Sequence, residues 1–205
     1  MCLVLAACSS HHQSELPYYS TPDFMPHWLP DDQLGGVHII PAFNLTDQEG
    51  QPVNLHTVKG KIYTANFFFT SCGSVCPRMM DNLEKVQQAF VNDKHVLILS
   101  HTVMPERDSV AVLKRYAIQH HINHHNWLLL TGDKDTIYHL ARQAYFADEA
   151  QGFYKGTNDF LHTENIVLVD ADGHIRGVYN GMLALETEHL IAHIKILERE
   201  MLAAR

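Results

Sequence analysis

Two cysteines follow the point where an apolar strand pattern gives way to a helical pattern, and this junction constrains the fold more than any other feature. Residues 61–69 form a β-favouring apolar run, Cys72 and Cys76 follow on a glycine-containing turn, and Pro77 opens a helix pattern that continues to about Val91. Strands that read as continuous apolar runs are buried on both faces. The junction therefore predicts a buried central strand that delivers two thiols to the start of a helix.

Strand and helix patterns alternate along the rest of the chain. Further strands are expected at 37–45, 52–55, 95–102, 127–131, 166–169 and 175–179, and helices at 108–121, 133–146 and 186–202. We expect Asp108 to cap one of these helices and Asp133 or Asp135 to begin another. This order predicts an α/β fold with a mixed central sheet, helices on both faces and an N-terminal β-hairpin.

The composition is that of a folded domain with an added N-terminal segment. Of 205 residues, 46% are hydrophobic and 19% are charged, and the net charge of −8 argues against a nucleic-acid partner. No stretch approaches the ~18 apolar residues of a membrane span. We expect residues 1–7 to be a signal-peptide remnant, 8–36 a lipidated tether with a proline-rich, aromatic arm, and 37–205 the domain that carries the cysteine pair.

The N-terminal sequence predicts an anchor. Leu5-Ala6-Ala7-Cys8 resembles the bacterial lipobox, in which the cysteine is lipidated and becomes the new N-terminus. Lipidated Cys8 would attach the protein to a membrane, with the domain outside the cytoplasm in a bacterial cell envelope. Cleavage would leave Cys72 and Cys76 as the remaining thiols. The alternative is a chance apolar N-terminus with a free Cys8.

Cys72 and Cys76 allow more than one chemistry. The start of a helix favours a thiolate at Cys76. With His162, which precedes the apolar run at 166–170, the pair could form a metal site with two sulfur ligands and one nitrogen. Thiolates favour Cu(I), and an added imidazole also suits Cu(II) or zinc. The same two thiols could close a disulfide, or they could be buried structural cysteines.

Histidine is unusually frequent in this chain. There are 16 His against 15 Lys plus Arg, and His120, His121, His124 and His125 cluster near the end of a predicted helix. If the helix continues that far, pairs four residues apart could chelate a divalent transition metal. The alternative is a solvated helix end, where protonated histidines suit the negative end of the dipole.

Three stretches together resemble the Sco/SenC family of thioredoxin-fold copper chaperones. They are Phe67-Phe68-Phe69-Thr70-Ser71-Cys72 continuing to Val75-Cys76-Pro77, then Pro105-Glu106-Arg107-Asp108, and then His162-Thr163 followed by a strand and Asp172-Gly173. The resemblance covers roughly residues 41–197. It implies a thioredoxin-like fold with a copper ion held by Cys72, Cys76 and His162.

The resemblance also implies a role. Members of that family deliver copper to the dinuclear CuA site of cytochrome c oxidase, or act as the thiol reductant that prepares its cysteines. We therefore expect a metallochaperone rather than an enzyme, with an oxidase subunit carrying CuA or another cuproprotein as partner. The alternative is an extracytoplasmic thiol–disulfide oxidoreductase. Leu161 and Met104 stand where the family usually has aspartate, and Met104 could be a core residue or a thioether near the copper.

Overall fold

The computed structural model describes residues 14–73, 75–147 and 163–203 and is built around a five-stranded sheet. Its strands are β3 (Ile62–Phe68), β4 (Val96–Thr102), β5 (Trp127–Leu130), β6 (Asn165–Val169) and β7 (Ile175–Asn180). Their order across the sheet is β5-β4-β3-β6-β7, with β3, β4 and β5 parallel to one another. Because β6 runs antiparallel to β3 and β7 antiparallel to β6, the predicted mixed sheet is confirmed.

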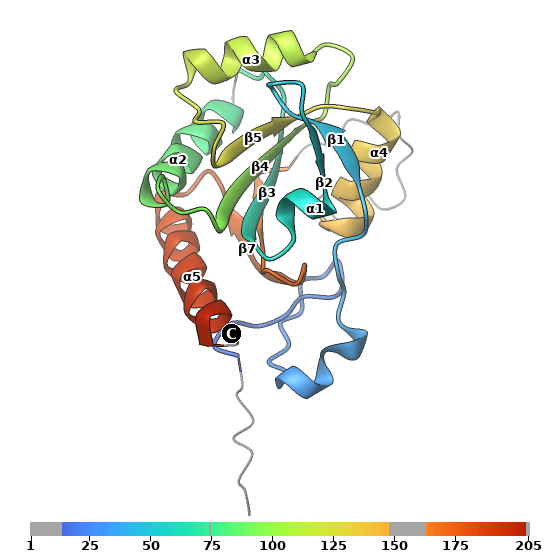
Figure 1. The fold of residues 1–205 in the computed structure, drawn as a ribbon, viewed down its shortest axis with the longest axis vertical. Helices are drawn as coiled ribbons and strands as arrows, with labels where there is room; N and C mark the ends of the chain where they lie inside the picture. Colours follow the sequence, from blue (N-terminus) through green and yellow to red (C-terminus); the bar gives the residue numbers. More distant parts are fainter. Residues whose placement is uncertain (1–13, 74, 148–162, 204–205) are drawn as a thin grey trace, which may run out of the picture.

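Helices cover both faces of the sheet, as the sequence predicts. One face packs against α2 (Val75–Ala89), α3 (Val110–Gln119) and α5 (Ala184–Ala203) (Figure 1). The other packs against α1 (Leu55–Val58), α4 (Lys134–His139) and the π-helical segment η2 (Leu140–Ala144). Alternation along β3 separates the two cores, since Tyr63 and Phe67 join the second while Ile62 and Phe68 join the first.

A small hairpin lies beside the main sheet and confirms the predicted N-terminal β-hairpin. It pairs β1 (Asn44–Thr46) with β2 (Pro52–Asn54) in antiparallel register. Its turn is held by the Asp47 carboxylate, which accepts hydrogen bonds from the backbone N–H groups of Glu49 and Gln51. A bridge between Thr46 and Thr131 joins the hairpin to the end of β5.

The described part of the N-terminal arm packs against the domain. Leu16 and Tyr18 are each only 4% exposed, and Tyr19 forms a bridge with Ile175 at the start of β7. The arm then enters a 3₁₀ helix, η1 (Asp31–Gly36). Apolar and aromatic side chains therefore make residues 14–20 part of the packed structure, whereas most of 21–30 is exposed.

Several boundaries differ from the sequence prediction. The strand expected at 37–45 is reduced to β1, because the backbone N–H of Ile40 bonds to Gly173 O at the β6–β7 turn instead of joining a neighbouring strand. Helix α2 begins at Val75, two residues before Pro77, so Cys76 lies inside its first turn. The cap of α3 is Ser109 rather than Asp108.

Two helix ends also differ. Helix α3 ends at Gln119, and His121 has a positive φ of 53°, so the helix does not reach the histidine cluster. Asp133 is confirmed as the cap of α4, where its carboxylate accepts from Thr136 N at 2.8 Å. The single helix expected at 133–146 changes to π-helical geometry at Leu140.

Candidate metal and thiol site

The two cysteines meet at the turn between β3 and α2. Cys72 lies four residues after β3 ends, and its backbone N–H bonds to Phe69 O at 3.2 Å. The backbone N–H of Cys76, in the first turn of α2, donates to Cys72 Sγ at 3.4 Å. The tight turn therefore brings the first sulfur against the start of the helix that carries the second. These two described cysteines are thiols here rather than disulfide partners.

The two thiols differ in exposure. Cys76 is 6% exposed and belongs to the core between the sheet and α2, whereas Cys72 is partly exposed and packs against the edge of that core. An incoming sulfur or metal ion therefore meets Cys72 first.

Burial makes Cys76 a weaker acid than the sequence predicts. Desolvation, and then the hydrogen bond with Cys72, raise the pKa of the Cys76 thiol to about 12. A helix N-terminus contributes only ~0.3–1 kcal/mol at an exposed position, which is less than one tenfold step in acidity. The expectation of a thiolate at Cys76 is therefore wrong for the reduced, metal-free protein, because burial outweighs the helix dipole.

A buried carboxylate holds the cysteine turn in place. Asp108, 2% exposed, accepts hydrogen bonds from the backbone N–H of Thr70 at 3.1 Å and from the Thr70 hydroxyl. It also accepts from the hydroxyl of Thr102, the last residue of β4. The sequence predicted that Asp108 caps a helix. In the structure Asp108 instead ties the turn before Cys72 to the neighbouring strand β4. Its place in the Pro105–Asp108 motif was the available signal.

An aromatic side chain from α3 completes the apolar surroundings of the pair. Tyr116 packs against Phe68 with ring centroids 5.6 Å apart. Burial, and then the neighbouring Cys76 and Cys72, raise the pKa of the Tyr116 phenol. Sequence reasoning missed this residue, because only the tertiary fold brings α3 over the cysteine turn. Met104 packs with the opposite core, which favours the core reading.

The remaining predicted site residues lie outside the described chain. These are His162, the expected third ligand, Cys8, the expected lipidation site, and Leu161. Within 14–73, 75–147 and 163–203, no three His, Cys, Asp or Glu side chains are arranged to hold a metal ion. Among those residues no helix combines the length and apolar character needed to cross a membrane.

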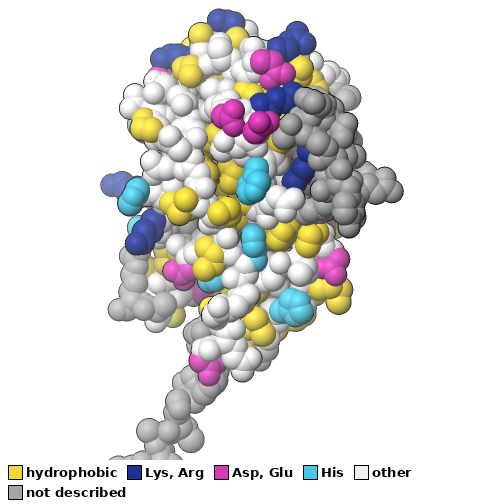
Figure 2. All heavy atoms as spheres, turned by 90° about the vertical axis from the view of Figure 1, so that its right-hand side faces the viewer, with side chains coloured by type: hydrophobic (Ala, Val, Ile, Leu, Met, Phe, Trp, Pro, Cys, Tyr) yellow, Lys and Arg dark blue, Asp and Glu magenta, His cyan; other side chains and the backbone are white. Residues whose placement is uncertain are grey.

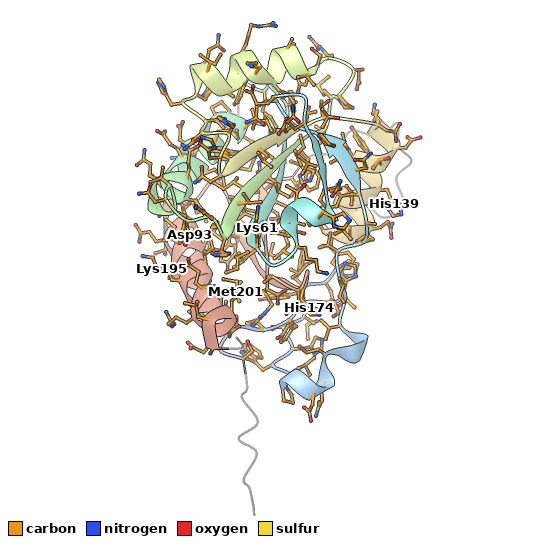
Figure 3. The ribbon with its side chains drawn as sticks, viewed as in Figure 1. Lys61, Asp93, His139, His174, Lys195 and Met201 are labelled. Carbon is orange, nitrogen blue, oxygen red and sulfur yellow. The ribbon has the colours of Figure 1, made fainter. Side chains whose placement is uncertain are left out.

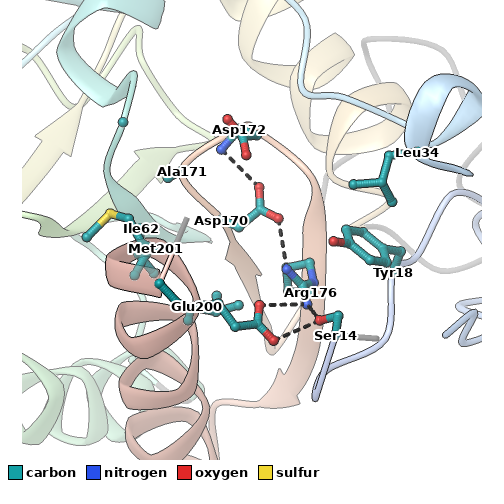
Figure 4. A pocket seen from close by; sticks show the side chains of 13 residues that line it. Ser14, Tyr18, Leu34, Ile62, Asp170, Ala171, Asp172, Arg176, Glu200 and Met201 are labelled. Carbon is teal, nitrogen blue, oxygen red and sulfur yellow. Dashed lines mark hydrogen bonds and ion pairs between the residues drawn. The ribbon is translucent and has the colours of Figure 1, made fainter. Parts of the chain in front are cut away.

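The opposite end of the sheet contains a cavity of about 500 Å³, and its chemistry is different. It is lined by residues from the start of β3, the β6–β7 turn, the arm and the end of α5 (Figure 4). Arg176 crosses it, donating to Asp170 at 3.0 Å and Glu200 at 3.2 Å while its guanidinium lies 4.1 Å from the Tyr18 ring centroid. Arg176 is paired with both carboxylates and also donates to Ser14 and Leu16 of the arm, so the residues around this cavity join the arm to the domain.

Comparisons with known proteins agree with this geometry. The family model described as SCO1/SenC matches residues 31–198. A SCO1/SenC family lipoprotein from Bacillus anthracis superimposes with a TM-score of 0.68 at 27% identity, covering 78% of this chain and 95% of that one. BsSco, described as having a disulfide switch and as a member of the Sco family of cytochrome c oxidase assembly proteins, gives 0.65 at 27% identity, with coverages of 78% and 93%.

A third similar structure was solved with copper bound. ScoI from Bradyrhizobium japonicum, solved with copper bound, superimposes with a TM-score of 0.60 at 30% identity, covering 77% of this chain and 98% of that one. The fold is thus the thioredoxin-like fold of these proteins. With its family model matched over most of its length and its cysteine pair at the β3–α2 turn, the chain belongs to the SCO1/SenC family.

Proposed function

We propose that this protein binds one copper ion through Cys72, Cys76 and His162 and supports assembly of the CuA site of cytochrome c oxidase. The observation that carries the proposal is the cysteine pair itself, joined by the 3.4 Å contact from Cys76 N to Cys72 Sγ at a turn held by Asp108. The copper-bound ScoI and the oxidase-assembly protein BsSco, both with this fold, support it.

The donor set fits a soft metal. Two thiolates suit Cu(I), and a chaperone must exchange its cargo, which the partial exposure of Cys72 allows. Copper would have to displace the proton that burial keeps on Cys76, so binding should strengthen as pH rises. Asp108 contributes by fixing the turn, which keeps both sulfur atoms at one place.

The register of β6 supports His162 as the third ligand. Tyr63 faces Val169 and Ala65 faces Val167, so continuing this antiparallel register sets Asn165 level with Phe67 near the end of β3. Residues 163–164, which directly precede β6, therefore lie at the end of the sheet from which the chain continues to Cys72. The proposal is that His162, three residues before Asn165, supplies an imidazole there.

The protein would act at a membrane in the bacterial cell envelope, through a lipid on Cys8. The motivation is the Leu5–Cys8 motif, and the B. anthracis relative is described as a lipoprotein. One acyl chain alone anchors weakly, whereas a diacylated cysteine supplies the two chains that stable anchoring needs. Cys8→Ser should move the full-length protein from the membrane to the soluble fraction, and retention on the membrane would refute the anchor.

A thiol–disulfide oxidoreductase is the second candidate, and the unequal exposure of the cysteines favours it. In the exchange, the Cys72 thiolate attacks a partner disulfide and releases one partner thiolate, which takes up a proton. Cys76 then loses its proton and attacks the mixed disulfide, which releases the second partner thiol. The protein ends as the Cys72–Cys76 disulfide, and the two electrons are on the partner.

Anaerobic copper titration of matched variants separates the two candidates. We expect Cys72→Ser and Cys76→Ser each to abolish tight Cu(I) binding, and His162→Ala to weaken Cu(II) while keeping both thiols titratable. The control replaces His120, His121, His124 and His125 with glutamine and should bind Cu(I) like the parent. If His162→Ala binds Cu(I) and Cu(II) like the parent, the three-ligand site is wrong. The thiol–disulfide oxidoreductase then becomes the better supported of the two candidate functions.

A further inference from the structure

The structure bears on both alternatives for the histidine cluster at 120–125, since each assumed that the preceding helix extends that far. The cluster after α3 is not helical, since α3 ends at Gln119 and His121 has a φ of 53°. His120 instead stacks on Tyr116 with ring centroids 4.1 Å apart. Histidines also occur at separate places on the face that carries α4 (Figure 2). In the cluster at 120–125, the neighbouring His124 and His125 have ring centroids 4.0 Å apart, but no pair is stacked along a helix face.

Helix α5 contains the arrangement that the other cluster lacks. His189 and His193 are one turn apart near the middle of this 20-residue helix, and their rings are nearly parallel, with centroids 6.4 Å apart and 12° between their planes. Residues four apart lie on the same helix face. The two imidazoles therefore stand next to each other over the surface of α5.

The two rings have oxygen atoms near the same nitrogen, but only His193 is hydrogen-bonded there. His193 Nδ1 lies 2.7 Å from the hydroxyl oxygen of Tyr179, a β7 side chain that is only 5% exposed. His189 Nδ1 lies 3.8 Å from a carboxylate oxygen of Glu186, one turn earlier on α5. Among the described residues no group engages either Nε2. His193 therefore has the pattern of metal-ligating histidines, in which an oxygen holds one nitrogen and the other is left for the ion.

We propose that His189 and His193 form a two-histidine chelate for a divalent transition-metal ion, with water completing the coordination. Imidazole suits Cu(II), Ni(II) and Zn(II). A metal–nitrogen distance of ~2.0–2.1 Å requires the two Nε2 atoms to be about 4 Å apart or closer. His189, whose side chain is 53% exposed, can turn towards His193 while the buried Tyr179 hydroxyl keeps His193 in place.

This site differs in ligand chemistry from the cysteine turn. Sulfur ligands at Cys72 and Cys76 select Cu(I), whereas two neutral imidazoles and water select divalent ions. Helix α5 packs against α2, the helix that begins with the cysteine turn. The chain would then hold a weaker, exchangeable site for divalent ions on α5 and a soft site at the start of α2.

The test uses the full-length protein with Cys72 and Cys76 both replaced by serine, so that sulfur ligands do not contribute. Cu(II) alone is titrated by calorimetry, and nitrogen coupling is read by electron paramagnetic resonance. In this background, His189→Gln/His193→Gln should weaken the tightest Cu(II) binding by at least about tenfold and remove the two-nitrogen signal. The matched control, His120→Gln/His124→Gln, should leave both unchanged.

A third variant separates positioning from general damage to the fold. Tyr179→Phe keeps the buried ring and removes only the hydroxyl behind His193, so we expect about tenfold weaker Cu(II) binding with unchanged circular dichroism. Unchanged affinity in His189→Gln/His193→Gln, or equal losses in that variant and the His120/His124 control, would overturn the proposal. Because the cysteines are absent and His162 is kept in every variant, the differences between variants do not depend on copper binding at the cysteine turn.

Discussion

The two ends of the central strand β3 are built in contrasting ways. At its start, Arg176 joins Asp170, Glu200 and the arm residues Ser14 and Leu16 in one buried set of charge-assisted hydrogen bonds. At its end, the turn that carries the thiols is held through one carboxylate, Asp108, and one of the sulfur atoms remains accessible.

The contrast separates stability from function. At the arm end, Arg176 is paired with Asp170 and Glu200 within the chain, and these contacts join the arm to the domain. At the cysteine end, the backbone N–H of Cys76 donates to Cys72 Sγ and both side chains are thiols, so both sulfur atoms can still bind a metal or form a disulfide. Substitutions at the arm end should therefore change folding stability most, and those at the cysteine end should change binding most.

The largest effect on stability is expected from Arg176→Met. This change leaves the carboxylates of Asp170 and Glu200 without their cation, and breaking a buried pair in this way costs ~3–5 kcal/mol. Urea denaturation should show a correspondingly lower free energy of unfolding. The control is Arg199→Met, whose partner Glu15 is 3.6 Å away on the surface, and which should change stability by less than about 1 kcal/mol.

Copper binding by the same Arg176→Met protein, measured well below its unfolding midpoint, should equal that of the parent. A loss of Cu(I) affinity in the folded variant would show that the two ends of β3 are coupled, and the separation drawn above would fail.

A smaller loss of stability and a larger change at the site are expected from Asp108→Ala. Removing the carboxylate leaves the buried hydroxyl of Thr102 and the backbone N–H of Thr70 unpaired, at a cost of ~1–3 kcal/mol. The loosened turn should also shift the reduction potential of the Cys72–Cys76 pair. An exposed aspartate on α4, Asp135→Ala, serves as control. An unchanged potential in folded Asp108→Ala would remove Asp108 from the positioning role.

A pH effect is expected from the carboxyl pair Glu198 and Asp93. Burial, and then the hydrogen bond to Asp93, raise the pKa of Glu198 to about 7, while the bond from Glu198 lowers the pKa of Asp93 against the effect of burial. Glu198, on α5, therefore keeps its proton beside ionised Asp93, which lies close to that helix (Figure 3).

Because the folded pKa of Glu198 is above its unfolded value, its stabilisation is complete below about pH 4.5 and is lost as pH rises through about 7. Glu198→Gln keeps a donor to Asp93 and should flatten the pH dependence of the unfolding free energy across that window. A variant that shows the parental slope would mean that another group titrates there.

The smallest effect on stability is expected from Cys72→Ser. Cys72 is partly exposed, and a serine oxygen can still accept from Cys76 N, so the unfolding free energy should change by less than about 1 kcal/mol. Tight Cu(I) binding should nevertheless be lost. A destabilisation as large as that of Arg176→Met would show that Cys72 is needed for folding stability. The two ends of β3 would then no longer differ in their contribution to stability.

Local patterns alone determined much of this protein. The apolar run before the cysteines predicted β3, the alternation of strand and helix predicted the mixed sheet, and the turn residues at 47–50 and 170–173 marked both hairpins. These features depend on burial periodicity and on turn chemistry, which neighbouring residues specify. The cysteine spacing and the motif around it likewise pointed to the family before any coordinates.

Tertiary structure decided what depends on residues distant in sequence. The acidity of Cys76 follows from burial under the core, which outweighs the helix dipole that the sequence shows. Asp108 reads as a helix cap until β3 and β4 lie side by side and bring Thr70 and Thr102 to it. The paired histidines on α5 acquire a buried oxygen neighbour only because β7 places Tyr179 there. Burial from solvent and contacts between distant residues depend on the folded structure, so they cannot be predicted from a short stretch of sequence.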